Sequence, residues 1–417
     1  MAGNREVAGV PRPRLLVAKG SFESMGGAER DLLRNLPAIA ESFDVSVATL
    51  ASASELGSAC EGLGLELMCP EERWSPPQGV LSSVLDSGMG SASKAWLSIG
   101  GLVESLNGFD CVHLTSGDGS LALLEHIPEM VPVHLHLLEP HRGLHEDVLH
   151  RGLDGTPKRS LGLTRAILSR SRRRDISAIR DLSLRSNSSI SGNSSYTAGR
   201  ISEVYGVRSG VLLPSVVSDE FPENAGEREP ESVGELEGEY VVSVGRASWV
   251  KGAWETISML SGSGVALAHV GGGDEDDLRK LEGHAKSMGV GLWCAPRLSS
   301  PELASLYRGA LAVVSMAHGE PFGLTPIEAQ SVGTPALFVD EGGFRETIVD
   351  GVSGRLLPRG DFDEWHRALS EARDPENRSS WSENGRVAIS EAGLDPRGHC
   401  DRLIIQLHHS SMPSAGN

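Results

Sequence analysis

The sequence lacks any run of about 18 consecutive apolar residues, so it offers no candidate for a membrane-spanning helix. Cysteine is also scarce, with five residues among 417 and no Cys-x-x-Cys pair. These cysteines are Cys60, Cys69, Cys111, Cys294 and Cys400. An odd and scattered set argues against a disulfide framework or a zinc site and favours buried free thiols in a reducing compartment. The first residues lack the apolar core of a secretion signal, so the expected location is the cytoplasm.

Positively charged residues are outnumbered: the sequence has 38 Lys and Arg and 56 Asp and Glu, which gives a formal net charge of −18. A surface this acidic is a poor candidate for binding nucleic acid. Glycine is abundant instead. Its 50 residues follow no three-residue period, which excludes collagen and indicates many turns and close backbone approaches. The apolar fraction of 39% is enough to build hydrophobic cores, and the length allows two or three domains.

The charge is unevenly distributed along the chain. Residues 142–185 contain eleven Lys or Arg and five Asp or Glu, with a dense basic run at 165–174. Three interpretations stay open for this run: a solvated helix face, a surface for peripheral contact with anionic lipid headgroups, or a site for an acidic acceptor. Residues 219–239 contain nine acids, one Arg and two prolines, and we expect them to form a solvated connection between two halves.

Apolar runs typical of buried strands alternate with helical patterns in both halves of the chain. The predicted strands cover residues 14–18, 44–50, 111–114, 131–137 and 189–191 in the first half, and 240–245, 265–270, 292–294, 311–315 and 335–339 in the second. This alternation predicts an α/β fold with two doubly wound parallel sheets, which bind ligands at the carboxyl ends of their strands. We expect a first domain at 1–215, a second at 216–395, a helix near 396–411 that packs back on the first, and a loose tail at 410–417.

The most informative segment is His318–Glu328, which follows a predicted strand and leads into a helix. Its residues 325–328 have the spacing of a capping box, with Thr325 as the N-cap residue and Glu328 three positions later. That interpretation leaves Glu320 and the glycines around it unexplained. Glycines beside the amides of a helix N-terminus are also typical of an anion site, so phosphate binding is an equally supported alternative.

This segment has two glutamates separated by seven residues, with Phe-Gly-Leu-Thr-Pro-Ile between them, and it resembles the signature of the retaining glycosyltransferases of family 4 (group 1). Other segments resemble further motifs of that family in the same order along the chain. They are Gly26–Arg30, Asn187–Ser189, Asn193–Ser195, Val211–Pro214, Val244–Gly252, Gly271–Glu275, Pro301–Tyr307 and Gly342–Glu346. The resemblance covers residues 14–410 and is strongest at 240–356. It implies the GT-B fold, two facing Rossmann-like domains with a cleft between them.

The resemblance implies that Arg246 and Lys251 bind the diphosphate of a nucleotide-sugar donor. An Arg fork and a Lys point charge after a buried strand suit phosphate oxygens. Glu328 would accept hydrogen bonds from ribose hydroxyls, and Glu320 would contact the donor sugar. The other implied donor-binding positions are Gly27, Arg297, Phe322, Gly323 and Leu324. The triple glycine at 271–273 precedes four acids that would repel a diphosphate, so we expect it to pack closely beside the site instead.

Alternation along the predicted strand 131–137 places His134 and His136 on the same face. In the family, a histidine at the end of the matching strand points toward the reacting sugar, which favours His136, with His134 as the second choice. A buried histidine with structural contacts only is the alternative for each. Glu139 and Arg142 follow in the region where the resemblance implies acceptor contacts. No metal is expected, because Arg, Lys and helix amides take its place in the family.

We therefore expect a hexosyltransferase that moves a hexose from a UDP- or GDP-sugar to an acceptor hydroxyl, with retention at the anomeric carbon. The implied catalytic residues are Glu320, His136, Arg246 and Lys251. The nucleotide sugar is a co-substrate, and no further cofactor is expected. The acceptor would be a glycan, a lipid-linked molecule or a small molecule. A nucleotide-sugar epimerase and a non-catalytic relative that binds nucleotide sugar are the alternatives on the same fold.

Overall fold

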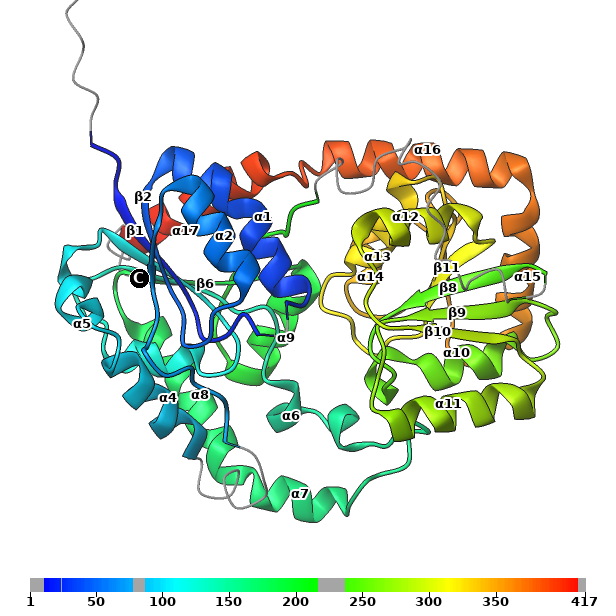
Figure 1. Ribbon diagram of the computed structural model, residues 1–417, viewed down its shortest axis with the longest axis horizontal. Helices are drawn as coiled ribbons and strands as arrows, with labels where there is room; N and C mark the ends of the chain where they lie inside the picture. Colours follow the sequence, from blue (N-terminus) through cyan, green and yellow to red (C-terminus); the bar gives the residue numbers. More distant parts are fainter. Residues whose placement is uncertain (1–10, 24, 78–86, 217–235, 237, 412–417) are drawn as a thin grey trace, which may run out of the picture. The chain divides into compact units, whose positions relative to one another are not determined.

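The computed structural model describes residues 11–23, 25–77, 87–216, 236 and 238–411. The chain divides into two compact units, and Figure 1 labels many of their helices and strands. The first is drawn from Met1–Leu137, Ser177–Ser191 and Cys400–Asn417, and the second from Leu138–Ile176 and Gly192–His399. The acidic connection predicted at 219–239 and the tail predicted at 410–417 fall mostly outside the described residues. The domain boundaries expected near 215 and 395 therefore stay predictions.

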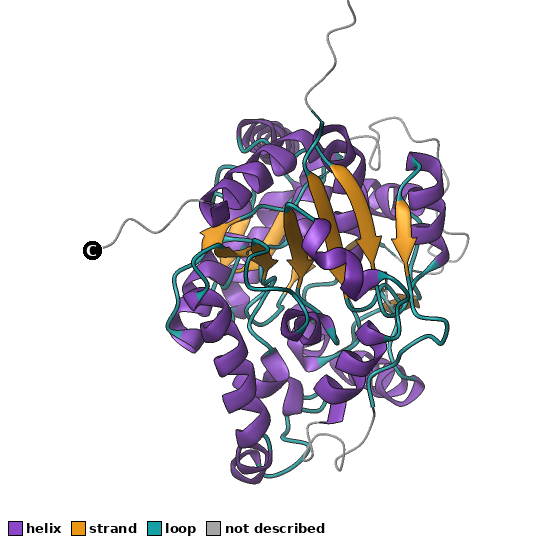
Figure 2. Ribbon diagram, turned by 90° about the vertical axis from the view of Figure 1, so that its left-hand side faces the viewer, coloured by secondary structure: helices purple, strands orange, loops and turns teal. Residues whose placement is uncertain are grey.

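The first sheet has seven strands in the order β3-β2-β1-β4-β5-β6-β7. They are β1 (Arg14–Lys19), β2 (Asp44–Ala48), β3 (Glu66–Met68), β4 (Cys111–Thr115), β5 (Val133–His136), β6 (Ser188–Gly192) and β7 (Gly210–Val211). Strand β1 pairs in parallel with both β2 and β4, so Leu15 lies between Val45 and Cys111. The continuous apolar runs in the sequence are explained by strands with both faces covered, and helices surround these strands in Figure 2.

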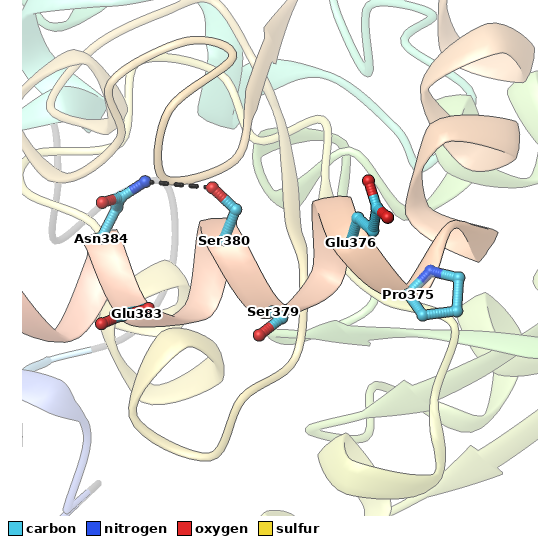
Figure 3. A pocket seen from close by; sticks show the side chains of 6 residues that line it. All are labelled: Pro375, Glu376, Ser379, Ser380, Glu383 and Asn384. Carbon is cyan, nitrogen blue, oxygen red and sulfur yellow. Dashed lines mark hydrogen bonds between the residues drawn. The ribbon is translucent and has the colours of Figure 1, made fainter.

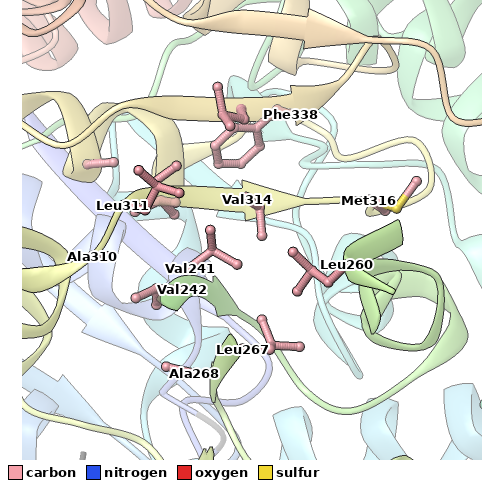
Figure 4. Close-up of a cluster of buried hydrophobic side chains, with 14 of the residues drawn as sticks. Val241, Val242, Leu260, Leu267, Ala268, Ala310, Leu311, Val314, Met316 and Phe338 are labelled. Atoms are coloured by element: carbon pink, nitrogen blue, oxygen red, sulfur yellow. The ribbon is translucent and has the colours of Figure 1, made fainter. Parts of the chain in front are cut away.

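The second sheet has six strands in the order β10-β9-β8-β11-β12-β13. They are β8 (Tyr240–Val244), β9 (Ala266–Val270), β10 (Leu292–Ala295), β11 (Ala312–Ser315), β12 (Ala336–Val339) and β13 (Arg355–Leu357). Strand β8 pairs in parallel with β9 and β11, with Val241 opposite Leu267 and Ala312. Side chains from these strands form one hydrophobic core, in which Val241, Leu267 and Phe338 are fully buried (Figure 4).

The helices follow the strands in alternation. Those of the first half are α1 (Gly27–Ser42), α2 (Ser54–Leu63), α4 (Ser87–Leu97), α5 (Leu102–Ser105), α6 (Arg142–His145), α7 (Leu161–Ile167), α8 (Ser169–Leu184) and α9 (Ser195–Tyr205). Those of the second half are α10 (Ala253–Leu260), α11 (Glu275–Met288), α12 (Ser300–Gly309), α13 (Leu324–Ser331), α14 (Phe344–Thr347), α15 (Phe362–Arg373), α16 (Pro375–Glu391) and α17 (Pro396–Ser411). Within the described ranges, none of the helices has the length and apolar character needed to cross a membrane.

The predicted α/β fold with two doubly wound parallel sheets is confirmed, and each predicted strand overlaps an observed one. The short strands β3, β7 and β13 were not predicted, because two or three residues of mixed burial leave no clear apolar run. A helix does occupy residues 396–411, as α17. From Cys400 onward the chain belongs to the first unit, where the hydroxyl of Ser189 donates to the carbonyl of Gln406 at 3.0 Å.

Candidate functional site

The loops after β8 and β11 bring together two of the residues predicted to bind a donor. Lys251 ends the single 3-10 turn Trp249–Lys251 after β8, and Glu320 lies in the loop after β11. The Lys251 ammonium lies 2.8 Å from a Glu320 carboxylate oxygen, and the two side chains are 36% and 21% exposed. Open parallel sheets bind their ligands at the carboxyl ends of strands. This ion pair therefore lies where a ligand of the second sheet would bind.

Two glycines shape the turn that carries Lys251. Gly252 has φ of +70°, and a Cβ there would lie 2.1 Å from the carbonyl oxygen of Met316, so no other residue fits without moving the backbone. Gly245 has φ of +146°, and its missing side chain leaves room for the stem of Lys251, 3.1 Å from the Cβ position. At the next loop, a Cβ on Gly271 would lie 2.7 Å from the carbonyl carbon of Gly245. This contact agrees with the prediction that the 271–273 loop packs closely beside the site.

Arg246, the second predicted diphosphate ligand, lies on the surface. Its guanidinium is 2.8 Å from a carboxylate oxygen of Asp274, and both side chains are about two-thirds exposed. Asp274 occupies the N-cap position of α11, but its side chain makes no capping hydrogen bond. An exposed pair of this kind contributes about 0–1 kcal/mol, so an anionic ligand could replace Asp274 at little cost.

The capping box predicted at 325–328 is wrong. Helix α13 begins at Leu324, two residues earlier than predicted, and its N-cap residue is Gly323 with φ of +92°. Glycine is required there because a Cβ would lie 2.6 Å from the ring of Phe344. Glu328 is instead 8% exposed and accepts a hydrogen bond from the hydroxyl of Tyr307 at 3.3 Å. Its carboxylate is therefore placed for a role other than capping.

The main chain around Glu320 is held by a second pair of glycines. The amide of Gly343 donates to the carbonyl of Glu320 at 2.7 Å. A Cβ on Gly342 would lie 2.6 Å from the same carbonyl oxygen, and one on Gly343 would lie 2.5 Å from the Cα of Phe322. Phe322 is buried in a hydrophobic cluster that also contains Val216, Ile327 and Leu394. The loop that presents Glu320 is therefore tightly packed against the segment before α14.

Charged side chains that the sequence analysis did not predict form a network that contacts this loop. The Arg359 guanidinium makes two hydrogen bonds of 2.8 Å to Glu341 and one of 3.0 Å to Glu255. It also donates to the carbonyl of Met316 at 2.7 Å. Burial raises the pKa of Glu341, but the bonds from Arg359 outweigh burial and lower that pKa overall. Glu255 in turn lies 2.7 Å from the His318 imidazole, which joins the network to the Glu320 loop.

Arg142 and Glu139, predicted on the acceptor side, also lie close to the Glu320 loop. Arg142 is largely buried, with an Nε that donates to Glu146 at 2.9 Å and an Nη2 that donates to the carbonyl of His318 at 2.6 Å. Partial removal from water raises the pKa of Glu139 to about 7. Arg142 opposes that rise in pKa, and the negative charge of Glu320 adds to it. The charge of Glu320 therefore affects the ionisation of Glu139.

The predicted histidines belong to the first unit and are buried in β5. The rings of His134 and His136 are stacked with their centres 6.4 Å apart, which confirms that they share a face. His134 is 2.9 Å from His113 on the neighbouring strand and 2.8 Å from the hydroxyl of Ser191. For His134 these contacts match the alternative of a structural histidine. His136 ends the strand, and its rank as first choice stays a prediction.

The remaining predicted positions are spread over both units. Gly27 is the exposed first residue of α1. Arg297 is exposed just after β10, and Leu324 begins α13. The basic run 165–174 spans the end of α7 and the start of α8. Two of its arginines are tied to the segment before them, Arg165 to the Asp147 carboxylate and Arg172 to a main-chain carbonyl.

None of the predicted site residues lines the hollow drawn in Figure 3. That hollow has a volume of about 460 Å³ and runs along α16 between Pro375 and Asn384. Among the residues that the structure describes, no three His, Cys, Asp or Glu side chains are arranged to hold a metal ion.

Residues 227–388 match the family model of the group 1 glycosyl transferases. A segment of 113 residues is 36% identical to the D-inositol 3-phosphate glycosyltransferase of Streptosporangium roseum, and this segment is 26% of each protein. The enzyme of the same name from Kribbella flavida is 32% identical over 134 residues, or 31% of each protein. The chain thus spans less than a third of the length of these curated relatives.

Solved structures match over nearly the whole chain. Anabaena HepE in complex with UDP and glucose has a TM-score of 0.67 at 16% identity, over 96% of this chain and all of that one. The sucrose-phosphate synthase of Thermosynechococcus elongatus has a TM-score of 0.68 at 17% identity, over 95% of this chain and 99% of that one. At such identities the match establishes the fold alone. Residues 227–388 are therefore similar to the group 1 glycosyl transferases, and the chain has the GT-B fold with two Rossmann-like domains.

Proposed function

We propose that this protein is a retaining hexosyltransferase, which moves a hexose from a nucleotide diphosphate sugar to an acceptor hydroxyl in glycan, glycolipid or glycoconjugate biosynthesis. The observation that carries the proposal is the Lys251–Glu320 ion pair at the carboxyl ends of β8 and β11. Such a donor needs a cation for its phosphates and a carboxylate for its sugar hydroxyls. The partial relatives named D-inositol 3-phosphate glycosyltransferase, and HepE with its UDP and glucose, support the same donor class.

In this proposal Arg246 and Lys251 bind the donor diphosphate. Arg246 exchanges its exposed partner Asp274 for a phosphate oxygen, and Lys251 turns from Glu320 toward the phosphates. The amides of Phe322, Gly323 and Leu324 at the start of α13 add hydrogen-bond donors and the positive end of the helix. Glu320 contacts the donor sugar, and Glu328 accepts hydrogen bonds from the ribose. Gly27 and Arg297 stay as further proposed donor positions.

Retention would follow from attack on the face that the diphosphate leaves. The bond from the anomeric carbon to the phosphate oxygen breaks, the acceptor oxygen bonds to the same face, and its proton passes to the departing phosphate oxygen. Lys251 and Arg246 stabilise the negative charge that develops on the diphosphate, which is the largest contribution expected from the protein. No metal and no further cofactor is needed in this scheme. His136, with His134 as second choice, would point toward the reacting sugar, and Glu139 would contact the acceptor.

We propose a cytoplasmic location with peripheral contact to anionic membrane through residues 165–174. Three arginines of this run, Arg170, Arg173 and Arg174, are exposed on α8, and each basic side chain near an anionic surface contributes about 1 kcal/mol. Co-sedimentation with vesicles that contain anionic lipid, but not with neutral vesicles, is the expected result. Equal recovery with both kinds of vesicle would contradict the contact.

The test of the function is the anomeric configuration of the product. The protein is incubated with a nucleotide sugar and extracts of candidate acceptors, and the new glycosidic bond is assigned by NMR. A product with the anomeric configuration of the donor is expected, and an inverted product would overturn the mechanism. A parallel incubation with donor alone separates the main alternative, because an epimerase would convert the nucleotide sugar without any acceptor.

A further inference from the structure

Arg142 lies in a position that suits a different role from contact with the acceptor. Its side chain is only 10% exposed, and two of its nitrogens are already engaged. Nε donates to Glu146 at 2.9 Å, and Nη2 donates to the main-chain carbonyl of His318 at 2.6 Å. Glu146 also accepts a hydrogen bond from Arg200 at 3.2 Å. The guanidinium is therefore fixed by a carboxylate on one side and binds the Glu320 loop on the other.

The same loop is anchored a second time, after Glu320. The hydroxyl of Ser194, the N-cap residue of α9, donates to the carbonyl of Pro321. That helix start is held in turn by Glu346, whose two carboxylate oxygens accept hydrogen bonds from the amides of Ser195 and Tyr196 at 2.9 and 2.7 Å. A carboxylate at a helix N-terminus satisfies amides that the helix itself leaves unpaired.

The hydrogen bonds from Arg142 and Ser194 hold the two ends of the loop 318–321, whose main chain is also restricted between them. Gly319 has φ of +54°, and a Cβ there would lie 2.8 Å from the hydroxyl of Tyr196. The carbonyl of Glu320 accepts a hydrogen bond from Gly343. The carbonyls of His318 and Pro321, on either side of Glu320, are held as well, so the main chain fixes the point from which the Glu320 side chain extends to Lys251.

We propose that Arg142 and Ser194 are positioning residues, which fix the loop 318–321 so that Glu320 meets the sugar of the donor. This inference rests on the proposed function, because it assigns to Glu320 the contact with the donor sugar. Neither residue needs to touch a substrate. If the loop is free to move, the productive direction of Glu320 is only one of several, and the affinity for the sugar part of the donor falls accordingly.

The test compares the binding of a nucleotide sugar with the binding of its bare nucleoside diphosphate, in the absence of acceptor. The probe is whichever of UDP-glucose, GDP-mannose and ADP-glucose the wild-type protein binds most tightly. For Arg142→Gln and Ser194→Ala we expect about tenfold weaker binding of the sugar nucleotide, the loss of one hydrogen bond, with the diphosphate bound as in wild type. Arg200→Gln is the matched control, because Arg200 shares Glu146 but, in the part of the chain that the structure describes, donates to Glu146 and Glu203 and not to the loop 318–321. It should leave both affinities unchanged.

A double variant separates positioning from a direct contact. If Arg142 acts through Glu320, the loss in Arg142→Gln with Glu320→Gln should be no larger than in Glu320→Gln alone. If the losses of affinity in the two single variants add up in the double variant, the inference is overturned. It is also overturned if Arg142→Gln binds the sugar nucleotide as tightly as the wild type does but has a raised KM for the acceptor. Ser194→Ala gives an independent readout if the arginine variant fails to fold. A wild-type protein that binds none of the sugar nucleotides would overturn the proposed function itself, and the positioning role with it.

Discussion

Replacing Glu328 by Gln tests whether its buried carboxylate binds the donor, because the two side chains have nearly the same shape. Glu328 is 8% exposed, and the Tyr307 hydroxyl donates to it at 3.3 Å. Gln keeps an oxygen that can accept this bond. The change therefore removes a negative charge from the wall of the site and leaves the packing of α13 in place. If ribose hydroxyls donate to Glu328, the variant loses the extra strength of a hydrogen bond to a charged acceptor.

The size of the effect follows from that one bond. A hydrogen bond to a charged group contributes about 1.5–3 kcal/mol, which corresponds to roughly a 10- to 150-fold change in affinity. The free energy of unfolding should change by less than about 1 kcal/mol, because Gln keeps an oxygen that can accept from the Tyr307 hydroxyl. The carboxylate would thus affect donor binding far more than it affects stability.

The assay is calorimetric titration with the nucleoside diphosphate alone, beside urea unfolding of the same variant. Glu302→Ala serves as the comparison, because Glu302 accepts a hydrogen bond from the Ser299 amide in the capping box of α12. Its loss should lower stability by about 0.5–2 kcal/mol without any change in nucleotide affinity. If Glu328→Gln behaves like Glu302→Ala, with lower stability and unchanged affinity, the ribose role is refuted.

Two further predictions concern the turn beside Lys251 and a carboxyl group near it. Gly252→Ala should lower the free energy of unfolding, measured by urea titration, by more than the roughly 1–2 kcal/mol that a left-handed alanine costs, because its Cβ meets the Met316 carbonyl. Gly262→Ala is the control, because Gly262 has φ of +77° but open space around its Cβ position, so this change should cost only the strain of the left-handed backbone. For Glu139, a pKa raised to about 7 means that the folded state binds its proton more tightly than the unfolded chain, so this stability is present at low pH and is lost as the pH rises toward 7. The melting temperature of Glu139→Gln relative to wild type should therefore rise between pH 5 and 8, and a constant difference would contradict the raised pKa.

The strands were predictable because their signal is local. Each predicted run of apolar residues can be read without knowledge of its neighbours, and parallel strands buried on both faces give continuous runs of this kind. The start of α13 could not be predicted in the same way. Thr325 has the better capping side chain, but the contact between Gly323 and the ring of Phe344, 21 positions along the chain, moves the start to Leu324. A distant packing contact thus outweighed a local preference.

The sequence predicted those residues of the site that belong to recognisable motifs. Lys251 and Glu320 were both expected to bind the donor, yet their ion pair depends on how two loops meet in space. The hydrogen bond from Arg359 to Glu255 joins residues 104 positions apart, and no sequence pattern indicates it. The same holds for Arg142, whose bond to His318 spans 176 positions. Residues that act through the main chain of a distant loop carry no local signal.

The central claim is that the Lys251–Glu320 site binds a nucleotide diphosphate sugar, and calorimetric titration with UDP-, GDP- and ADP-sugars tests it most directly. The wild-type protein should bind at least one of them, and Lys251→Met, which keeps the apolar stem along Gly245, should bind it about 10- to 100-fold more weakly. Lys286→Met, which removes an equally positive but exposed charge at the end of α11, should bind as the wild type does. Equal affinities in Lys251→Met and wild type, or no binding of any sugar nucleotide, would contradict the account.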